Sequence, residues 1–172
     1  MRVLLLITVF VIVFTNGFAQ RRVPGEKGVS SVGVIVGYGI ETEKAVAGID
    51  YRYNILDKVR LAPSVLYNVK RNEADILYVN ADVHYLARIT PKITLYPLGG
   101  LGVFVWRNWV PELVGFTVKK QTESDLRIGL NLGFGGEMRI TKDFILGAEF
   151  RYNWTKQFYN QAMLLARFAY YF

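Results

Sequence analysis

Apolar residues recur at every second position through nearly the whole chain after residue 28. The segment 126–140 is the clearest case, because Leu126, Ile128 and Leu130 alternate with polar or small residues. Successive side chains of a strand point to opposite faces, so a period of two predicts β-strands and not an amphipathic helix. The sequence therefore predicts a sheet protein whose strands each have one apolar and one polar face.

Turn-forming residues divide the alternating region into about eight segments of strand length. We expect strands at residues 29–40, 47–55, 59–69, 77–89, 93–106, 126–140, 144–154 and 162–172. Pro63, inside the third segment, predicts a bulge or a poorly paired position, because proline cannot donate a backbone hydrogen bond.

The connections between these segments differ in length. Three are short, at residues 56–58, 90–92 and 141–143, and four are longer, at residues 41–46, 70–75, 107–125 and 155–161. Outer-membrane barrels have an even number of strands, short periplasmic turns and longer external loops, and about ten residues suffice for one tilted crossing. We therefore predict an all-β fold, an eight-stranded antiparallel up-and-down transmembrane β-barrel over residues 29–172.

Composition agrees with a membrane barrel. Hydrophobic residues make up 52% of the chain and the mean hydropathy is +0.20, yet no apolar run after residue 28 approaches the roughly 20 residues of a transmembrane helix. A membrane barrel presents one face of every strand to lipid and needs more apolar residues than a soluble domain of its size. The chain has no cysteine, which excludes a disulfide framework and a cysteine-rich zinc site.

The N-terminal segment has the three-part pattern of a secretory signal peptide. Arg2 is followed by an apolar run at residues 3–14, and the small residues Gly17 and Ala19 precede a cleavage position after residue 19. A signal anchor is the alternative, but a run of about a dozen apolar residues is too short to span the membrane. We expect a signal peptide at 1–19, a flexible leader at 20–28 and the barrel at 29–172.

The polar face of the expected strands carries many charges. Buried charges must be paired, and we expect a charge network inside the barrel, where glycines give it room. Its predicted members are Asp50, Arg52, Arg60, Asp82, His84, Arg88, Arg127, Glu137, Arg139, Glu149, Arg151 and Arg167.

His84 is the chain's one histidine, and Asp82 lies on the same face. A general base is one interpretation, but neighbours at i and i+2 of a strand meet by chance, and Ser64 is the nearest serine on that face. We favour interior packing and expect no catalytic residues, no cofactor and no metal site. Aromatic residues near the predicted strand ends are expected to form interface girdles: Tyr38, Tyr53, Tyr67, Tyr85, Trp106, Tyr152, Trp154 and Tyr170.

The net charge of +7 does not indicate nucleic-acid binding, because export separates the protein from nucleic acid and the basic residues are scattered. The expected partners are outer-membrane lipid and lipopolysaccharide. Arg107, Lys119 and Lys120 in the predicted long loop either lie near lipopolysaccharide phosphates or are simply solvated. No surface partner follows from the sequence.

Four segments carry a family resemblance: YPLGGLGVF (96–104), GLNLGFGGEMRI (129–140), LGAEFRYNW (146–154) and the ending ARFAYYF. They resemble small outer-membrane β-barrel, porin-like proteins and the barrel domain of the outer-membrane protein A and X type. The predicted cleavage region, GFAQ (17–20), resembles exports of the Bacteroidetes group. The alternating aromatics Phe168, Tyr170 and Phe172 resemble the signal read by the barrel-assembly machinery, which the resemblance implies as a partner.

The expected function is that of an integral protein of the bacterial cell outer membrane with a structural, adhesion or surface-interaction role. No wide pore is expected, because side chains fill the interior of an eight-stranded barrel. A lipid-modifying outer-membrane enzyme is an alternative. A second is an exported lipocalin-like barrel, although that fold would turn its apolar face inward.

Overall fold

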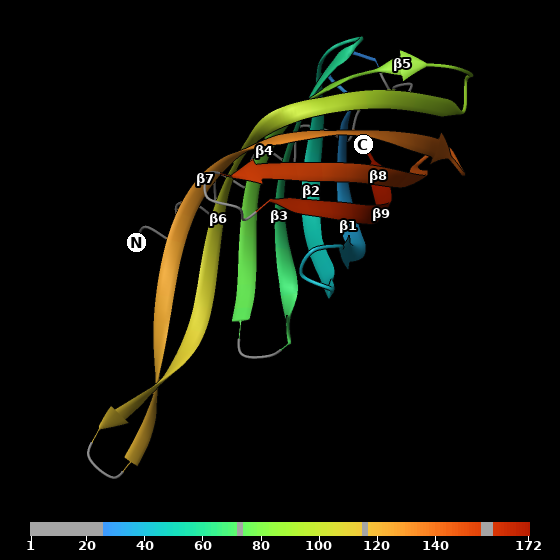
Figure 1. Cartoon of the computed structure of the whole chain (residues 1–172). Helices are drawn as coiled ribbons and strands as arrows, with labels where there is room; N and C mark the ends of the chain where they lie inside the picture. The colour runs from blue at the N-terminus through green and yellow to red at the C-terminus, as the bar shows by residue number, and fades with distance from the viewer. Residues whose placement is uncertain (1–25, 72–73, 115–116, 156–159) are drawn as a thin grey trace, which may run out of the picture.

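The computed structural model describes residues 26–71, 74–114, 117–155 and 160–172, and these form one antiparallel barrel (Figure 1). The strands are β1 (Ser30–Gly39), β2 (Lys44–Leu56), β3 (Val59–Arg71), β4 (Ala74–Tyr85), β5 (Ala87–Arg88), β6 (Ile93–Val114), β7 (Thr117–Arg139), β8 (Phe144–Thr155) and β9 (Gln161–Tyr171). No helix in these ranges is long and apolar enough to cross a membrane. The predicted signal peptide lies outside the described residues.

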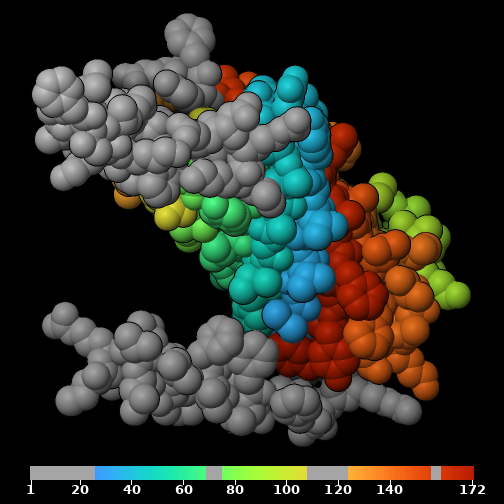
Figure 2. All heavy atoms as spheres, turned by 90° about the horizontal axis from the view of Figure 1, so that it is seen from below, coloured from blue at the N-terminus to red at the C-terminus, as the bar shows by residue number. Residues whose placement is uncertain are grey.

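The barrel closes between its first and last strands. Each strand pairs with its neighbour in the chain, and β1 pairs with β9, so that Val34 faces Phe168. Figure 2 shows the first strand, in blue, beside the last, in red. The short β5 continues the line of β4 after Leu86, since both pair with β6. The wall therefore has eight strands, and the predicted fold is confirmed.

The alternation in sequence becomes an inside and an outside. On β1, Val34 and Val36 are 55% and 59% exposed on the outer face, whereas Ile35 between them is 2% exposed. The same pattern holds on the other strands, and the exposed large apolar side chains cover the outside of the barrel. An apolar exterior with a polar interior suits a barrel surrounded by lipid. It is the reverse of a lipocalin, so that alternative is wrong.

The two ends of the barrel differ. At the turn end, short turns join β2 to β3, β5 to β6 and β7 to β8. The described end of the leader also lies there, where Lys27 N donates to Asp57 Oδ1 at 2.9 Å and Gly28 N to Asn54 O at 2.7 Å. These bonds join residues 27 and 28, the end of the predicted leader, to β2 and the turn after it. At the loop end, the connections join β1 to β2, β3 to β4, β6 to β7 and β8 to β9.

The largest departure from prediction is the segment 107–125, which was expected to be a loop. Strand β6 instead runs on to Val114 and β7 begins at Thr117, in unbroken register from Ile93–Met138 to Val114–Thr117. Figure 1 shows this hairpin extending past the loop ends of β3 and β4. We call residues 109–114 of β6 and 117–128 of β7 the arm.

Pro63 has a normal partner on one side only. It faces Ala81 within an unbroken run of pairs between β3 and β4. On the other side, the ladder between β2 and β3 has no pairs between Asp50–Ser64 and Tyr53–Leu61, although the register is the same before and after the gap. The predicted poor pairing at Pro63 thus occurs toward β2, and there is no bulge.

Candidate functional site

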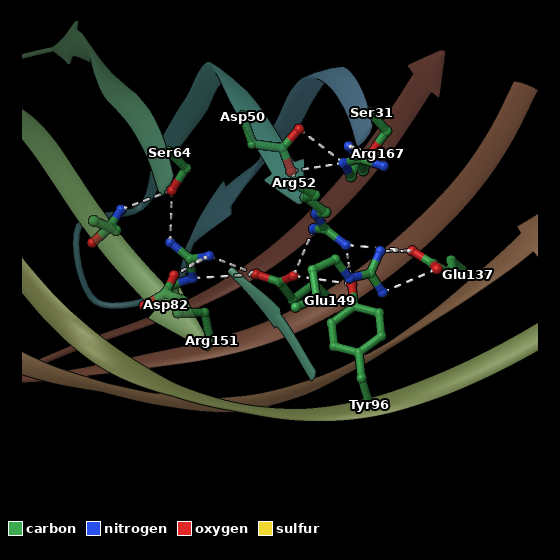
Figure 3. Close-up of polar contacts among 12 residues, drawn as sticks. Ser31, Asp50, Arg52, Ser64, Asp82, Tyr96, Glu137, Glu149, Arg151 and Arg167 are labelled. Carbon is green, nitrogen blue, oxygen red and sulfur yellow. Dashed lines mark hydrogen bonds and ion pairs between the residues drawn. The ribbon is translucent and has the colours of Figure 1, made fainter. Parts of the chain in front are cut away.

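The barrel interior contains a layer of charged side chains, shown in Figure 3. Four arginines and four carboxylates form it, each at most 6% exposed. They are Arg52, Arg60, Arg151, Arg167, Asp50, Asp82, Glu137 and Glu149. Strands β2, β3, β4, β7, β8 and β9 each contribute at least one of them, because every second residue of a wall strand points inward. The charges of this layer balance.

Arg52 lies at the centre of the layer. Its guanidinium donates to Asp50 Oδ2 at 2.7 Å, to Glu149 Oε2 at 3.0 Å and to the Tyr96 hydroxyl at 2.9 Å. It also lies 3.5 Å from Glu137 Oε2. One arginine thus connects β2 with β6, β7 and β8 across the lumen.

The other three arginines complete the layer. Arg60 donates to both oxygens of Glu137, at 2.9 and 3.0 Å. Arg151 Nη2 lies 2.8 Å from both an Asp82 oxygen and a Glu149 oxygen. Arg167 Nε lies 2.7 Å from Asp50 Oδ2, and its Nη2 donates to Ser31. Bidentate pairing of this kind gives arginine–carboxylate contacts both strength and fixed geometry.

Polar and apolar layers fill the lumen between the charges and the loop end. Asn131 Nδ2 donates to Asp82 and Asn80, and Asn153 Nδ2 donates to Asn131. Above these amides lies a buried apolar cluster, made of Ile35, Val46, Leu66, Ile76, Tyr78, Phe104, Met163 and Leu165. Trp106 packs against this cluster, so its predicted place in an outer girdle is wrong. Tyr38, Tyr53, Tyr85, Trp154 and Tyr170 do lie exposed on the outside.

Tyr96 is an interior site residue that the sequence analysis missed. Its hydroxyl donates to Glu149 at 3.0 Å, and the Arg52 and Arg60 guanidinium carbons lie 5.3 and 5.2 Å from its ring centroid. Gly135 makes room for it, because a Cβ there would lie 2.6 Å from the ring. The available signal was parity, since Tyr96 shares the inward face of its strand with Leu98, Gly100 and Gly102.

His84 is buried in the same region without forming a catalytic arrangement. Its ring stacks on Tyr96 with 4.5 Å between centroids, and neither ring nitrogen has a hydrogen-bond partner in the described part of the chain. Asp82 instead lies against Arg151 and Asn131, and the Ser64 hydroxyl accepts from Arg151 and Asn80. Nothing in this geometry activates a serine or orients the imidazole as a base.

Three predicted members of the charge network lie apart from it. Arg88 is exposed on β5, and Arg139 is half-buried at the turn end. Arg127 lies against Asp125 on its own strand, because β8 ends opposite Gly129 and encloses no lumen at that height. All three have the inward parity of their strands, but they lie too near or beyond the ends of the wall to reach the central carboxylates.

The aromatic ending lies at the seam of the barrel at the turn end. Phe168 and Tyr170 face outward, 47% and 40% exposed. Phe144 of the neighbouring strand stacks on Phe168 at 5.3 Å between ring centroids and lies tilted against Tyr170 at 5.5 Å. Phe172 stacks on Tyr170 at 6.4 Å and its backbone nitrogen donates to Ser30 O. Among the described residues, no group of histidines and carboxylates could hold a metal ion.

Comparisons with known proteins show which family has this architecture. The family model described as "Outer membrane protein beta-barrel domain" matches residues 11–172. No curated protein sequence matches the chain. The solved barrels that are similar in fold include the following three.

The N-terminal barrel domain of OprF from Pseudomonas aeruginosa has a TM-score of 0.63 at 15% identity, covering 85% of this chain and 98% of that one. Neisserial surface protein A also has a TM-score of 0.63 at 15% identity, covering 83% and 95%. Ail, the attachment invasion locus protein of Yersinia pestis, has a TM-score of 0.58 at 18% identity, covering 85% and 99%. The protein is thus located in the bacterial outer membrane, and the chain belongs to the outer membrane protein beta-barrel domain family.

Proposed function

We propose that this protein acts through its surface at the loop end, by binding an extended polypeptide along the edge of the β6–β7 arm. It would be neither a diffusion porin nor an enzyme. The observation that carries the proposal is that each strand of the arm has a strand neighbour on one edge only, among the described residues. Among the described residues, β7 pairs with β8 only from Gly129 onward, so residues 117–128 have a strand neighbour on one side alone.

The other edge of the arm is shorter but also open. The pairing of β4 with β6 ends at Ala74–Asn108, which leaves residues 109–114 of β6 with β7 as their only strand neighbour in the described chain. A strand edge presents a row of backbone donors and acceptors that an added strand can satisfy. The main chain then supplies affinity, and side chains at alternate positions supply specificity.

The orientation of the arm supports an external role. Outer-membrane barrels keep their short turns in the periplasm, and the arm extends from the opposite end (Figure 1). Ail, one of the similar barrels, is named as an attachment protein, which agrees with a surface role. The absence of a wide pore is supported by the side chains that fill the lumen. The charged layer and the apolar cluster both occupy the cross-section of the barrel. The two His84 ring nitrogens, which accept or donate no hydrogen bond among the described residues, support the absence of catalysis.

The test compares the full barrel with a variant whose arm is short. Replacing residues 110–121 by Asn-Gly keeps the Trp109–Thr122 pair and closes it with a two-residue hairpin turn. Peptides of about twelve residues would be selected from a random library against the full barrel in phosphatidylcholine nanodiscs. We expect selected peptides to slow amide hydrogen exchange in residues 117–128 and to lose at least about tenfold in affinity for the short-arm variant, roughly the loss of 1.4 kcal/mol.

The matched control is Lys142→Gln, which changes an exposed cation at the turn end and should leave peptide affinity unchanged. Equal peptide binding by the short-arm variant would contradict the proposal, as would selection of peptides that protect only the turn end. Heat-modifiable migration on gels confirms that each variant is folded.

A further inference from the structure

A pocket opens at the turn end of the barrel, inside its rim. It has a volume of about 470 Å³ and lies between the β5–β6 turn and the last residues of β7. Its polar lining consists of Arg88, Thr90, Lys92, Thr94, Glu137 and Arg139. Thr94 and Glu137 face each other across the β6–β7 ladder, which places this lining on the inner face of the wall. The pocket is therefore the vestibule below the charged layer.

The one acid in this lining is already occupied. Both Glu137 oxygens accept from Arg60, at 2.9 and 3.0 Å, and Oε1 also accepts from the Tyr171 hydroxyl. Arg52 approaches the same carboxylate at 3.5 Å. Glu137 therefore belongs electrostatically to the layer above and does not neutralise the cations of the vestibule.

Arg139 has no such partner. Its Nε is buried and makes no hydrogen bond, and no described carboxylate lies within ion-pair distance of its guanidinium. A buried charged donor without an acceptor is costly, and such groups are normally paired or hydrogen-bonded. Arg88 and Lys92 add positive charge to the lining of the same pocket. The vestibule thus contains one buried cationic donor, Arg139 Nε, that has no acceptor among the described residues.

The threonine in the turn contributes a further donor. Thr90 Oγ accepts from the backbone nitrogens of Lys92 and Ile93, at 3.3 and 3.0 Å. Because these bonds use the oxygen as an acceptor, the hydroxyl proton remains for donation to a ligand. Cations and hydroxyls around one cup supply more donors than the two oxygens of a carboxylate can accept, and this favours a phosphate group.

We propose that the vestibule is a phosphate-binding site whose principal ligand group is the Arg139 guanidinium. The filled layer above it makes the site a blind cup, so a phosphate enters and leaves from the periplasmic side. The phosphate could belong to a soluble periplasmic compound or to the headgroup of a lipid at the rim. This site is independent of the arm and of the function proposed for it.

The test is a titration of the refolded full barrel in phosphatidylcholine nanodiscs with inorganic phosphate at constant ionic strength. The NMR signal of the Arg139 Nε–H group reports binding to the unchanged protein, and isothermal titration calorimetry gives the dissociation constant for the unchanged protein and for every variant. We expect the signal to shift and Arg139→Gln to weaken binding by about tenfold or more, as for loss of a charge-assisted hydrogen bond. Lys142→Gln, an exposed cation on the next turn that does not line the pocket, should change binding less than about twofold.

A second arm of the experiment separates the two sources. Nanodiscs containing phosphatidylglycerol should shift the Arg139 signal without added phosphate if a lipid headgroup is the ligand, and should leave it unchanged if the ligand is soluble. If Arg139→Gln does not fold, Lys92→Gln replaces it and should weaken binding more than Lys142→Gln. An Arg139 signal that responds to neither phosphate nor phosphatidylglycerol, or equal binding by the pocket variant and the Lys142 control, overturns the proposal.

Discussion

The two halves of the β6–β7 hairpin are made of the same strands in the same register, yet they are held in different ways. In the wall, β6 pairs with β7 on one side and with β4 and β5 on the other, and Tyr96 and Phe104 point into a packed lumen at 1% exposure each. In the arm the strands pair only with each other, among the described residues. At its base Arg127 lies against Asp125, whose side chain is 56% exposed.

This contrast separates the stability that backbone hydrogen bonds give from the stability that enclosure in the barrel gives. Backbone pairing is continuous through both halves, so it alone cannot make one half more stable than the other. The wall adds a second neighbour and an inner face from which water is excluded, and there both charge pairing and close packing become strong. The arm keeps its strand form but has open edges.

The largest expected effect concerns a carboxylate of the wall compared with one of the arm. Glu149→Ala removes the partner of Arg52, Arg151 and Tyr96 and leaves buried arginine charge uncompensated, which typically costs about 3–5 kcal/mol. Glu123→Ala on the arm is the control and should have little effect. Urea midpoints of the refolded variants measure both effects. Equal midpoints would show that the wall and the arm do not differ in the cost of losing a carboxylate.

The second effect concerns the backbone itself. Amides of residues 109–114 and 117–128 should exchange with solvent on the order of 100-fold faster than those of residues 95–105, because they can open without disturbing the wall. Hydrogen exchange followed by NMR in nanodiscs measures this difference. Uniform protection along the hairpin would mean that the arm is covered by something beyond its own two strands.

The third effect concerns two adjacent glycines of the wall. A Cβ on Gly135 would lie 2.6 Å from the Tyr96 ring, whereas one on Gly136 would meet the flexible end of Leu95 at 3.0 Å. Gly135→Ala should therefore destabilise by about 1–3 kcal/mol through overpacking, and Gly136→Ala by less. The urea midpoints decide, and the reverse order would show that the lumen is less tightly packed than the Tyr96 contacts indicate.

The fourth effect is close to zero. It would separate the contribution of the packed His84 ring from that of its polar nitrogens. His84 contributes a stacked ring but no hydrogen bond, and replacing an unsatisfied polar group with an apolar one of similar shape is nearly neutral or stabilising. His84→Phe should leave the urea midpoint unchanged or raise it slightly. Marked destabilisation would indicate a polar partner of the imidazole, such as water.

A small effect on stability is also expected at the end of the chain. Phe172 contributes a peripheral stack on Tyr170, so its deletion should shift the urea midpoint by less than about 1 kcal/mol. If the aromatic ending serves the barrel-assembly machinery, the same deletion should still lower the amount of heat-modifiable barrel in the outer membrane. Unchanged amounts would contradict that recognition role.

The sequence predicted the wall well because lipid imposes an apolar outer face on each crossing. Parity then assigned residues such as Arg52, Arg60 and Glu137 to the interior. The arm was missed because residues 107–125 carry no period of two in apolar residues and were interpreted as a loop.

The sequence also did not predict the height of each side chain along the barrel axis. Arg127 and Arg139 have the same inward parity as Arg151, but parity does not say where a strand loses its neighbour or where the lumen opens. Tyr96 was missed because its role depends on contacts with Arg52 and Glu149, which are far away in the sequence and meet only in the closed barrel.

The interior ion pairs also couple insertion to closure. Arg167 on β9 reaches Asp50 on β2 across the seam at which β1 meets β9, and the two residues are 117 positions apart in the chain. In a sheet still open at that seam, Arg167 would be separated from this carboxylate, while Asp50 would keep Arg52 of its own strand. The interior charges are therefore fully paired only when the last strand pairs with the first. The two events belong to one cooperative step, and a half-inserted, open sheet is a high-energy species.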